Sequence, residues 1–375
     1  MIIKGLRVEK EKLQSLQKFW RLRVMLFETP GYNEILDLYI AYGVVECLVR
    51  EGVENLRFFP IGNKYCIVVE EPTNVNIKNR IEKGMLNALE DMLSLHKAIG
   101  KYISTKEDIK IISDVDFSAG ANINNVYWDG IPKTLEKIKE NIKKGKLSTK
   151  SKNTVPLTLM PAAGKYMPKI YGVKGGNPIK IDDSNYALAW IGFHYYAPYI
   201  NISDNRATYI HIYAIKPLEE LGLIEILALK DLKKKINNYQ LGKYKFFVNK
   251  KLALLYHLTH TESISALEIV TKKNFSVVSY TLENVDNNQA IRSFGEYDLS
   301  KLMDFLWYLK ATDFYNTIQF VDNILRGDLE VSLTFIDGIL YDDLDAVYSA
   351  IRKLKSVRIS PLIIQSILEW FGNFY

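Results

Sequence analysis

The 375-residue sequence holds few of the residues that carry out chemistry in enzymes. It has two cysteines, Cys47 and Cys66, and five histidines. Two cysteines exclude both a disulfide scaffold and a four-cysteine zinc site. GxSxG, CxxC, Walker A and protein-kinase signatures are all absent from the sequence. The lack of any catalytic constellation favours a binding or scaffold role, so we expect no enzymatic activity, no cofactor and no metal.

Long apolar runs are also scarce. The N-terminus has no apolar stretch typical of a signal peptide, so we expect a cytoplasmic protein with reduced cysteines. Residues 184–203 form a 20-residue stretch without a formal charge, which is the length of a membrane span. Asn185, His194, Pro198 and Asn201 make this stretch too polar for the hydrocarbon layer, so we interpret it as an interior strand and expect no membrane association.

The composition supports a packed core. Apolar residues make up 48% of the chain, charged residues 25% and aromatic residues 12%, which excludes global disorder. The length corresponds to two or three domains or to one large domain. The formal net charge of +6 is mild, and it is compatible with nucleic-acid binding without demonstrating it.

The first hundred residues predict helices and one hairpin. Charged residues interleave with Leu13, Leu16, Phe19 and Trp20, which predicts a helix over roughly the first 30 residues. A second helix is expected from an Asn33 cap to Arg50, with Gly52 as its stop. Two β-prone runs, 57–61 and 64–69, flank Gly62-Asn63 and predict a β-hairpin, and a long helix follows over 77–103.

The middle of the chain is mixed. We expect a short strand at 108–112, an irregular loop at 118–125, a polar helix at 132–146 and loop structure over 147–180. Strands are predicted over 186–200 and 207–215 around a turn cluster at 201–206. Pro217 is expected to open a helix that runs to about Asn237.

From about residue 250 the pattern becomes mostly helical. Apolar stripes occur over 299–309, 314–325 and 344–354, and Ser360-Pro361 is typical of the start of a last helix. We therefore predict an α+β fold: an N-terminal region with β-hairpins over 1–250 and a C-terminal helical bundle over 251–375.

The clearest chemical feature is a basic segment from Lys133 to Lys180, which has twelve lysines, two glutamates and no arginine. Ammonium groups at this density can contact a phosphate backbone, and point charges favour contact that does not depend on base sequence. The alternative is a solvated helix face followed by a loop. The residues that we expect to contact nucleic acid in this segment are Lys143, Lys144, Lys146, Lys150, Lys152, Lys165, Lys169 and Lys174.

Other candidates are less specific. Asn122, Asn124 and Asn125 lie in a stretch of small residues and can read base edges, or they can hydrogen-bond the backbone of their own loop. The turn at Gly175-Gly176 can approach a phosphate, although it matches no nucleotide-binding motif and is more typical of a plain turn. The aromatic cluster of residues 190–196 can stack on bases, but an uncharged strand is more typical of core.

Two alternatives involve metals. His257 and His260 are separated by one helical turn but lack a third ligand, so we interpret them as helix-surface histidines. Asp108-Ile-Lys110 fits the end of a nuclease carboxylate–lysine motif, a spacing that also arises by chance.

Several segments resemble the large subunit of the archaeal type I-A CRISPR interference complex (Cascade). These segments are Thr29-Pro-Gly-Tyr-Asn-Glu-Ile-Leu-Asp-Leu-Tyr-Ile-Ala-Tyr-Gly-Val-Val-Glu46, Phe117-Ser-Ala-Gly-Ala-Asn-Ile-Asn124, Leu157-Thr-Leu-Met-Pro-Ala-Ala-Gly164 and Ala187-Leu-Ala-Trp-Ile-Gly-Phe-His-Tyr-Tyr196. Together with the length and the helical C-terminal part, the resemblance spans most of the chain.

The resemblance implies a non-enzymatic DNA- and RNA-binding subunit that acts in antiviral defence. Its expected partners are guide RNA, target DNA, the backbone and small subunits, and a helicase-nuclease that it helps to recruit. It also implies a part in sensing the short motif beside the target, while base pairing reads the rest. Two alternatives stay open: a protein–protein scaffold without direct nucleic-acid binding, and a divergent nuclease that uses Asp108 and Lys110.

Overall fold

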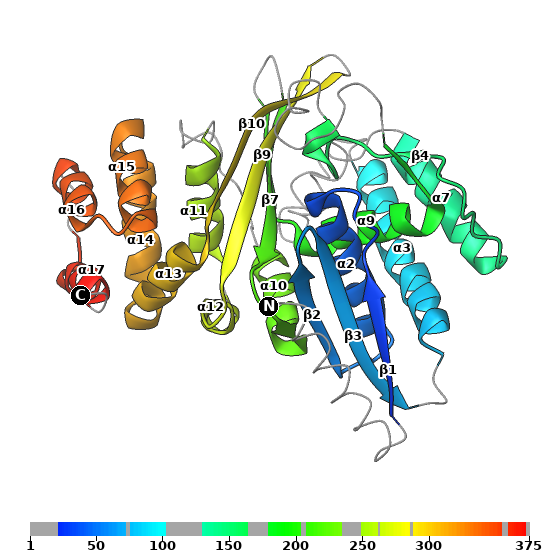
Figure 1. Ribbon diagram of the computed structural model, residues 1–375. Coiled ribbons are helices and arrows are strands. Elements are labelled where there is room, and N and C mark those ends of the chain that lie inside the picture. Colours follow the sequence, from blue (N-terminus) through cyan, green and yellow to red (C-terminus); the bar gives the residue numbers. More distant parts are fainter. Residues whose placement is uncertain are drawn as a thin grey trace.

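The computed structural model describes residues 22–72, 76–102, 130–163, 179–203, 208–234, 249–261, 263–285, 288–354 and 359–372. These residues form an α+β fold with two four-stranded antiparallel sheets, one two-stranded sheet and a helical C-terminal part, which confirms the predicted fold class. Figure 1 shows the elements in chain order, with the C-terminal helices at one end of the molecule. None of the described helices is both long and apolar enough to cross a membrane.

The first sheet has the strand order β1-β3-β2-β8. It consists of β1 (Leu22–Glu28), β2 (Leu56–Ile61), β3 (Lys64–Pro72) and β8 (Leu221–Gly222). β2 and β3 confirm the predicted hairpin. The helix predicted up to residue 30 is wrong over 22–28, because this run is β-prone and pairs along its whole length with β3. Residues 1–21 lie outside the described residues.

One long buried helix, α2 (Glu34–Arg50), contacts β3 of the first sheet and β7 of the second. The side chain of Asn33 accepts a hydrogen bond from the Ile35 amide and caps the helix as predicted. Tyr42 on α2 donates a hydrogen bond from its hydroxyl to the carbonyl of Ile215, 2.8 Å away in the second sheet. The side chains of α2 are buried along nearly its whole length, so this helix forms the centre of the core.

The segment interpreted as an interior strand, 186–200, is instead largely helix. α9 (Asp183–Tyr196) begins at the cap residue Asp182 and packs closely against α2. The prediction failed because α9 is buried on nearly all sides, so its sequence has no polar face and no helical period. Trp190 and Phe193 are fully buried, which confirms that the aromatic cluster belongs to the core.

The second sheet has the order β10-β9-β7-β6. Its strands are β6 (Tyr199–Ser203), β7 (Thr208–Pro217), β9 (Phe275–Val285) and β10 (Asn288–Asp298). β7 confirms the predicted strand, but the helix expected from Pro217 begins only at α10 (Leu223–Lys234), after β8. The long β9–β10 hairpin was not predicted, because the region after 250 was expected to be mostly helical.

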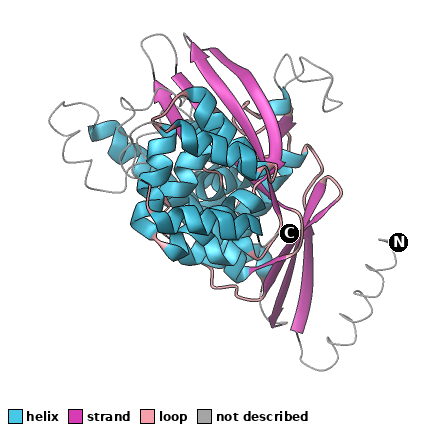
Figure 2. Ribbon diagram, turned by 90° about the vertical axis from the view of Figure 1, so that its left-hand side faces the viewer, coloured by secondary structure: helices cyan, strands magenta, loops and turns pink. Residues whose placement is uncertain are grey.

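The remaining helices lie on two sides of this framework (Figure 1). In the N-terminal part these are α3 (Ile77–Tyr102) and α7 (Gly130–Lys143), which pack against each other. This part also contains the short paired strands β4 (Asn153–Thr154) and β5 (Lys180–Ile181) and a 3-10 turn at Pro161–Ala163. The C-terminal helices are α11 (Lys250–His260), α12 (Ile264–Thr271), α13 (Ser300–Thr312), α14 (Phe314–Leu325), α15 (Leu329–Leu340), α16 (Leu344–Lys353) and α17 (Pro361–Gly372). Figure 2 shows these C-terminal helices as one cluster beside the strands.

The predicted domain boundary near residue 250 stays a prediction. β7 precedes it and β9 follows it, and the two strands pair along ten positions from Thr208 to Pro217.

Candidate nucleic-acid interface

The helix α7 separates apolar from basic side chains. Ile131, Leu135 and Ile138 are buried at i, i+4 and i+7, and they hold the helix against the core. Lys133 and Lys137 are exposed on the opposite side. Figure 1 shows α7 at the outer edge of the molecule, on the far side of α3 from α2. The exposed lysines of this helix and of the chain that follows it form what we call the lysine surface: Lys133, Lys137, Lys143, Lys144, Lys146, Lys150 and Lys152.

A glycine turns the chain at the end of α7. Gly145 has φ +63°, a left-handed conformation that favours glycine. The Lys146 amide donates to the carbonyl of Asn141, and the Gly145 amide donates to the carbonyl of Ile142. These two bonds form a Schellman motif, which satisfies helix-end carbonyls and fixes the direction of the chain beyond Lys144.

A buried carboxylate, Asp183, holds the next part of the segment. Its oxygens accept hydrogen bonds from the Ser148 amide at 3.2 Å and from the Asn153 side chain at 2.9 Å, and Lys152 lies 3.2 Å away. Desolvation by burial alone would raise the pKa of Asp183, but these hydrogen bonds and the Lys152 charge together hold that pKa below its ordinary value. Residues 148–153 are therefore fixed to the start of α9.

Few carboxylates neutralise the lysine surface. Glu90 on α3 lies 3.8 Å from Lys139 and 3.9 Å from Lys143, and Glu140 lies 3.4 Å from Lys144. Such exposed pairs stabilise a protein little. Within the described ranges, Lys133, Lys137, Lys146 and Lys150 form no ion pair, so the surface keeps a positive excess.

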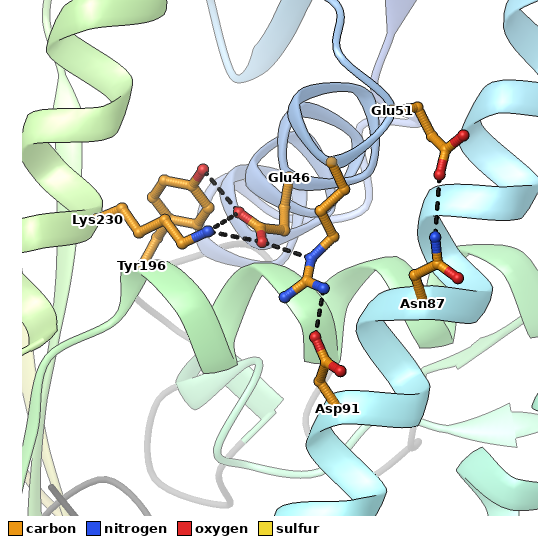
Figure 3. A network of polar contacts seen from close by, with 7 residues as sticks. Glu46, Glu51, Asn87, Asp91, Tyr196 and Lys230 are labelled. Carbon is orange, nitrogen blue, oxygen red and sulfur yellow. Dashed lines mark hydrogen bonds and ion pairs between the residues drawn. The ribbon is translucent and has the colours of Figure 1, made fainter.

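A buried polar network surrounds Glu46 on α2, as Figure 3 shows. The Glu46 carboxylate is fully buried and lies 2.8 and 2.9 Å from Lys230 Nζ and 2.7 Å from Arg50 Nε. The Tyr196 hydroxyl donates a further hydrogen bond to it at 3.2 Å. A buried charge needs such partners, so this network joins α2, α9 and α10.

The network continues from the core toward α7. Arg50 also pairs with Asp91 on α3 at 2.5 Å, and the neighbouring residue Glu90 meets Lys139 and Lys143 on α7. On the same helix Asn87 donates to Glu51 at 3.0 Å, as Figure 3 shows. A series of polar contacts therefore links the buried network on α2 through α3 to α7.

A second lysine of α10 lies close to this network. Lys233 Nζ donates to the carbonyl of Phe193 at 3.3 Å and lies over the ring of Tyr199. Burial lowers the pKa of Lys233 to about 7, although the nearby negative charge of Glu46 acts to raise it. The lysine supports the C-terminal end of α9, where a cation interacts favourably with the helix dipole.

The two histidines of α11 have structural partners. His257 is buried and its Nε2 lies 3.0 Å from the carbonyl of Leu232, so its interpretation as a helix-surface residue was wrong. His260 is half-buried and pairs with Asp322 at 2.9 Å, a partner 62 positions away that no local motif could reveal. Among the residues that the structure describes, no group of three His, Cys, Asp or Glu side chains could hold a metal ion.

Five of the predicted contact residues lie in the described part of the chain: Lys143, Lys144, Lys146, Lys150 and Lys152 are all exposed and belong to the lysine surface. The other predicted residues lie outside the described residues: Lys165, Lys169, Lys174, Asn122, Asn124 and Asn125. The same holds for Asp108 and Lys110 and for the Gly175-Gly176 turn. Two residues that position the surface, Gly145 and Asp183, were not predicted. A glycine within Lys-Lys-Gly-Lys and the Asp182-Asp183 pair before an apolar run were the available signals.

The comparison with known families covers nearly the whole chain. Residues 25–374 match the sequence model of the family described as CRISPR-associated protein (Cas_Csa4). The matched region includes all but the first residues of β1, the other strands, α7 with the lysine surface, and the C-terminal helices. This chain therefore belongs to the Cas_Csa4 family of CRISPR-associated proteins.

Proposed function

We propose that this protein is the large subunit of an archaeal type I-A CRISPR effector complex, and that it binds nucleic acid as a non-enzymatic cytoplasmic subunit. Membership of a CRISPR-associated family supports the setting in antiviral defence. In this proposal its partners are guide RNA, target DNA, the backbone and small subunits, and a helicase-nuclease. It contributes to sensing the motif beside the target, while base pairing between guide and target reads the sequence.

The observation that carries the proposal is the lysine surface. Seven exposed lysines lie on a helix and on a chain segment that Gly145 and Asp183 hold in place. Lysines supply point charges for phosphate oxygens, and ordered backbone around them reduces the entropy lost on binding. We propose that this surface contacts the phosphate backbone without reading bases.

The test is binding of the purified chain to single-stranded DNA, duplex DNA and RNA over about 50–200 mM salt. The variant combines Lys137→Ala, Lys146→Ala and Lys150→Ala, three exposed lysines without an ion pair in the described part of the chain. On duplex DNA we expect the slope of log affinity against log salt to become shallower by about 2–3, because each phosphate contact contributes about 0.9.

A matched control removes the same charge elsewhere. Lys78, Lys272 and Lys353 have side chains that are 83, 69 and 51% exposed and lie outside the lysine surface. Their triple alanine variant should keep a slope close to that of the unmodified chain. Equal slopes for the two triple variants would refute the assignment of the surface, and Mg²⁺-dependent cleavage that Asp108→Ala abolishes would refute the non-enzymatic role.

A further inference from the structure

A groove between α16 and α17 lies at the end of the molecule opposite α7 (Figure 1). Its cavity has a volume of about 140 Å³. A cavity of about 150 Å³ with apolar walls accommodates a benzene-sized group, so this groove can accept one branched or aromatic side chain.

Both helices contribute an apolar stripe to the groove. On α16 the stripe consists of Leu344, Val347, Tyr348 and Ile351, at i, i+3, i+4 and i+7. Of these four side chains, only Val347 is buried, against α15. This spacing is that of a helix that packs against a helical neighbour. Leu344 and Ile351 are only half-buried and Tyr348 is exposed.

The stripe on α17 faces it with the same spacing. Ile364, Ile367 and Leu368 occupy i, i+3 and i+4, and the side chain of Leu368 is 48% exposed. The opposite side of α17 is fixed to the bundle, where Trp370 donates to Asp304 on α13 at 2.7 Å. The two stripes thus form the two walls of an apolar groove that runs between α16 and α17.

The lining of the groove carries one positive charge. Arg352 is the one charged side chain in the lining, and its guanidinium lies 4.4 Å from the centre of the Tyr348 ring. Within the described part of the chain Arg352 pairs with no carboxylate, whereas the neighbouring Lys353 pairs with Glu330 at 3.4 Å. A ligand that places an apolar side chain in the groove can therefore also pair a neighbouring carboxylate with the Arg352 guanidinium.

We propose that this groove binds an amphipathic helix of another protein, with an apolar face at three- and four-residue spacing and a Glu or Asp that pairs with Arg352. The mode is helix-in-groove recognition, in which the apolar anchors supply affinity and the rim charge supplies orientation. The surface lies far from the lysine surface, so one molecule can bind nucleic acid and this partner together. The inference does not depend on the proposed nucleic-acid binding.

The test uses two fluorescent peptides and the full chain. One peptide has Leu at every third and fourth position with Glu on both flanks, and the other has Lys in place of every Glu. We expect fluorescence anisotropy to show at least tenfold tighter binding of the Glu peptide. Arg352→Glu should remove this preference, and Lys272→Glu, which makes the same charge change at a remote exposed site, should preserve it.

A second pair of variants tests the apolar contact. Leu368→Glu should weaken binding of the Glu peptide at least tenfold, while Leu218→Glu, at another exposed leucine, should change it less than twofold. Circular dichroism of each variant checks that the bundle is folded. If Arg352→Glu and Lys272→Glu have equal effects, or if neither peptide binds saturably, the proposal is wrong.

Two other occupants would overturn the proposal. Removal of residues 373–375, which directly follow α17, would increase peptide affinity sharply if the chain's own end filled the groove. Sedimentation would show a dimer that Leu368→Glu dissociates if a second copy filled it. The proposed partner helix requires a monomer whose peptide affinity is unchanged by the truncation.

Discussion

Gly192 of α9 lies so close to Tyr39 of α2 that a Cβ atom at position 192 would be 1.8 Å from the Tyr39 carbonyl oxygen. The relationship is reciprocal, because a Cβ atom at Gly43 of α2 would be 2.0 Å from the carbonyl oxygen of Leu188 on α9. Backbone atoms cannot move aside as a flexible side chain can. The two glycines therefore set the distance between the two central helices.

Gly192→Ala should destabilise the fold by about 3 kcal/mol or more, because the methyl group forces α2 and α9 apart in a packed core. Urea unfolding followed by circular dichroism measures this change. Gly130→Ala is the control, since a Cβ atom there would have no neighbour within 4 Å. Similar midpoints for Gly192→Ala and the unmodified chain would contradict the close packing of these helices.

Asp183→Asn should weaken the anchor of the lysine surface. The asparagine lacks the charge and offers only one oxygen to the Ser148 and Asn153 donors, so we expect a loss of about 1–3 kcal/mol. Because its folded-state pKa is lowered, the stabilisation by Asp183 is present above the unfolded pKa of about 3.9 and is lost as pH falls below it. Unfolding at pH 7 and pH 3 therefore should show a smaller difference between the two proteins at pH 3.

Glu46→Gln tests the buried network. The substitution leaves Arg50 and Lys230, whose side chains are only 21 and 19% exposed, without their shared carboxylate. We expect the free energy of unfolding to fall by about 3 kcal/mol. This is at the low end of the range for a broken buried ion pair, because both cations keep some contact with water. Glu330→Gln is the control: its side chain is 83% exposed, and its loss should cost less than about 0.5 kcal/mol.

Residue patterns with a clear period or a clear cap made most of the fold predictable. Asn33 marked the start of α2, Gly62-Asn63 marked the β2–β3 hairpin, and amphipathic stripes gave α7 and several C-terminal helices. α9 escaped prediction because burial on nearly all sides removes the polar face on which periodicity depends. β9 was not predicted because it pairs with β7 across about 70 residues of chain, and β10 is placed in the sheet only by its pairing with β9.

In the candidate site, too, local features could be predicted from the sequence and long-range contacts could not. The exposure of Lys143, Lys144 and Lys146 follows from the amphipathic α7 and from local composition, so sequence alone could indicate it. The contact of Ser148 with Asp183 spans 35 positions, and that of Arg50 with Asp91 spans 41. Such pairs are created by tertiary packing, and no local pattern encodes them.

His257 should make the protein sensitive to acid. Desolvation by burial lowers its pKa to about 4, against about 6.5 when unfolded, so between these values only the unfolded state gains a proton. Stability therefore falls as pH drops from about 6.5 to 4. His257→Gln can still donate to the carbonyl of Leu232 but does not titrate, so its unfolding midpoint should depend less on pH over this range. Parallel pH profiles for the two proteins would contradict the buried neutral histidine.

Lys310 should make the stability of the protein depend on pH above pH 7. Its side chain is 1% exposed, and Nζ donates to the carbonyls of Leu258 at 3.0 Å and Thr261 at 2.7 Å, at the end of α11. Burial lowers the pKa of Lys310 to about 7, whereas the unfolded value is about 10.4. Between these values the unfolded state holds the extra proton, so stability rises with pH by up to about 1.4 kcal/mol per unit.

Lys310→Met isolates this contribution, because Lys233 and Lys250 also have lowered pKa values and remain in both proteins. The variant loses two hydrogen bonds and should be less stable at every pH, so the slope with pH is the informative quantity. We expect urea unfolding between pH 7 and 10 to show a smaller rise in stability for Lys310→Met than for the unmodified chain. An equal rise would mean that Lys310 stays protonated in the core throughout this range, and that the carbonyls at the end of α11 fully compensate the desolvation of its charge.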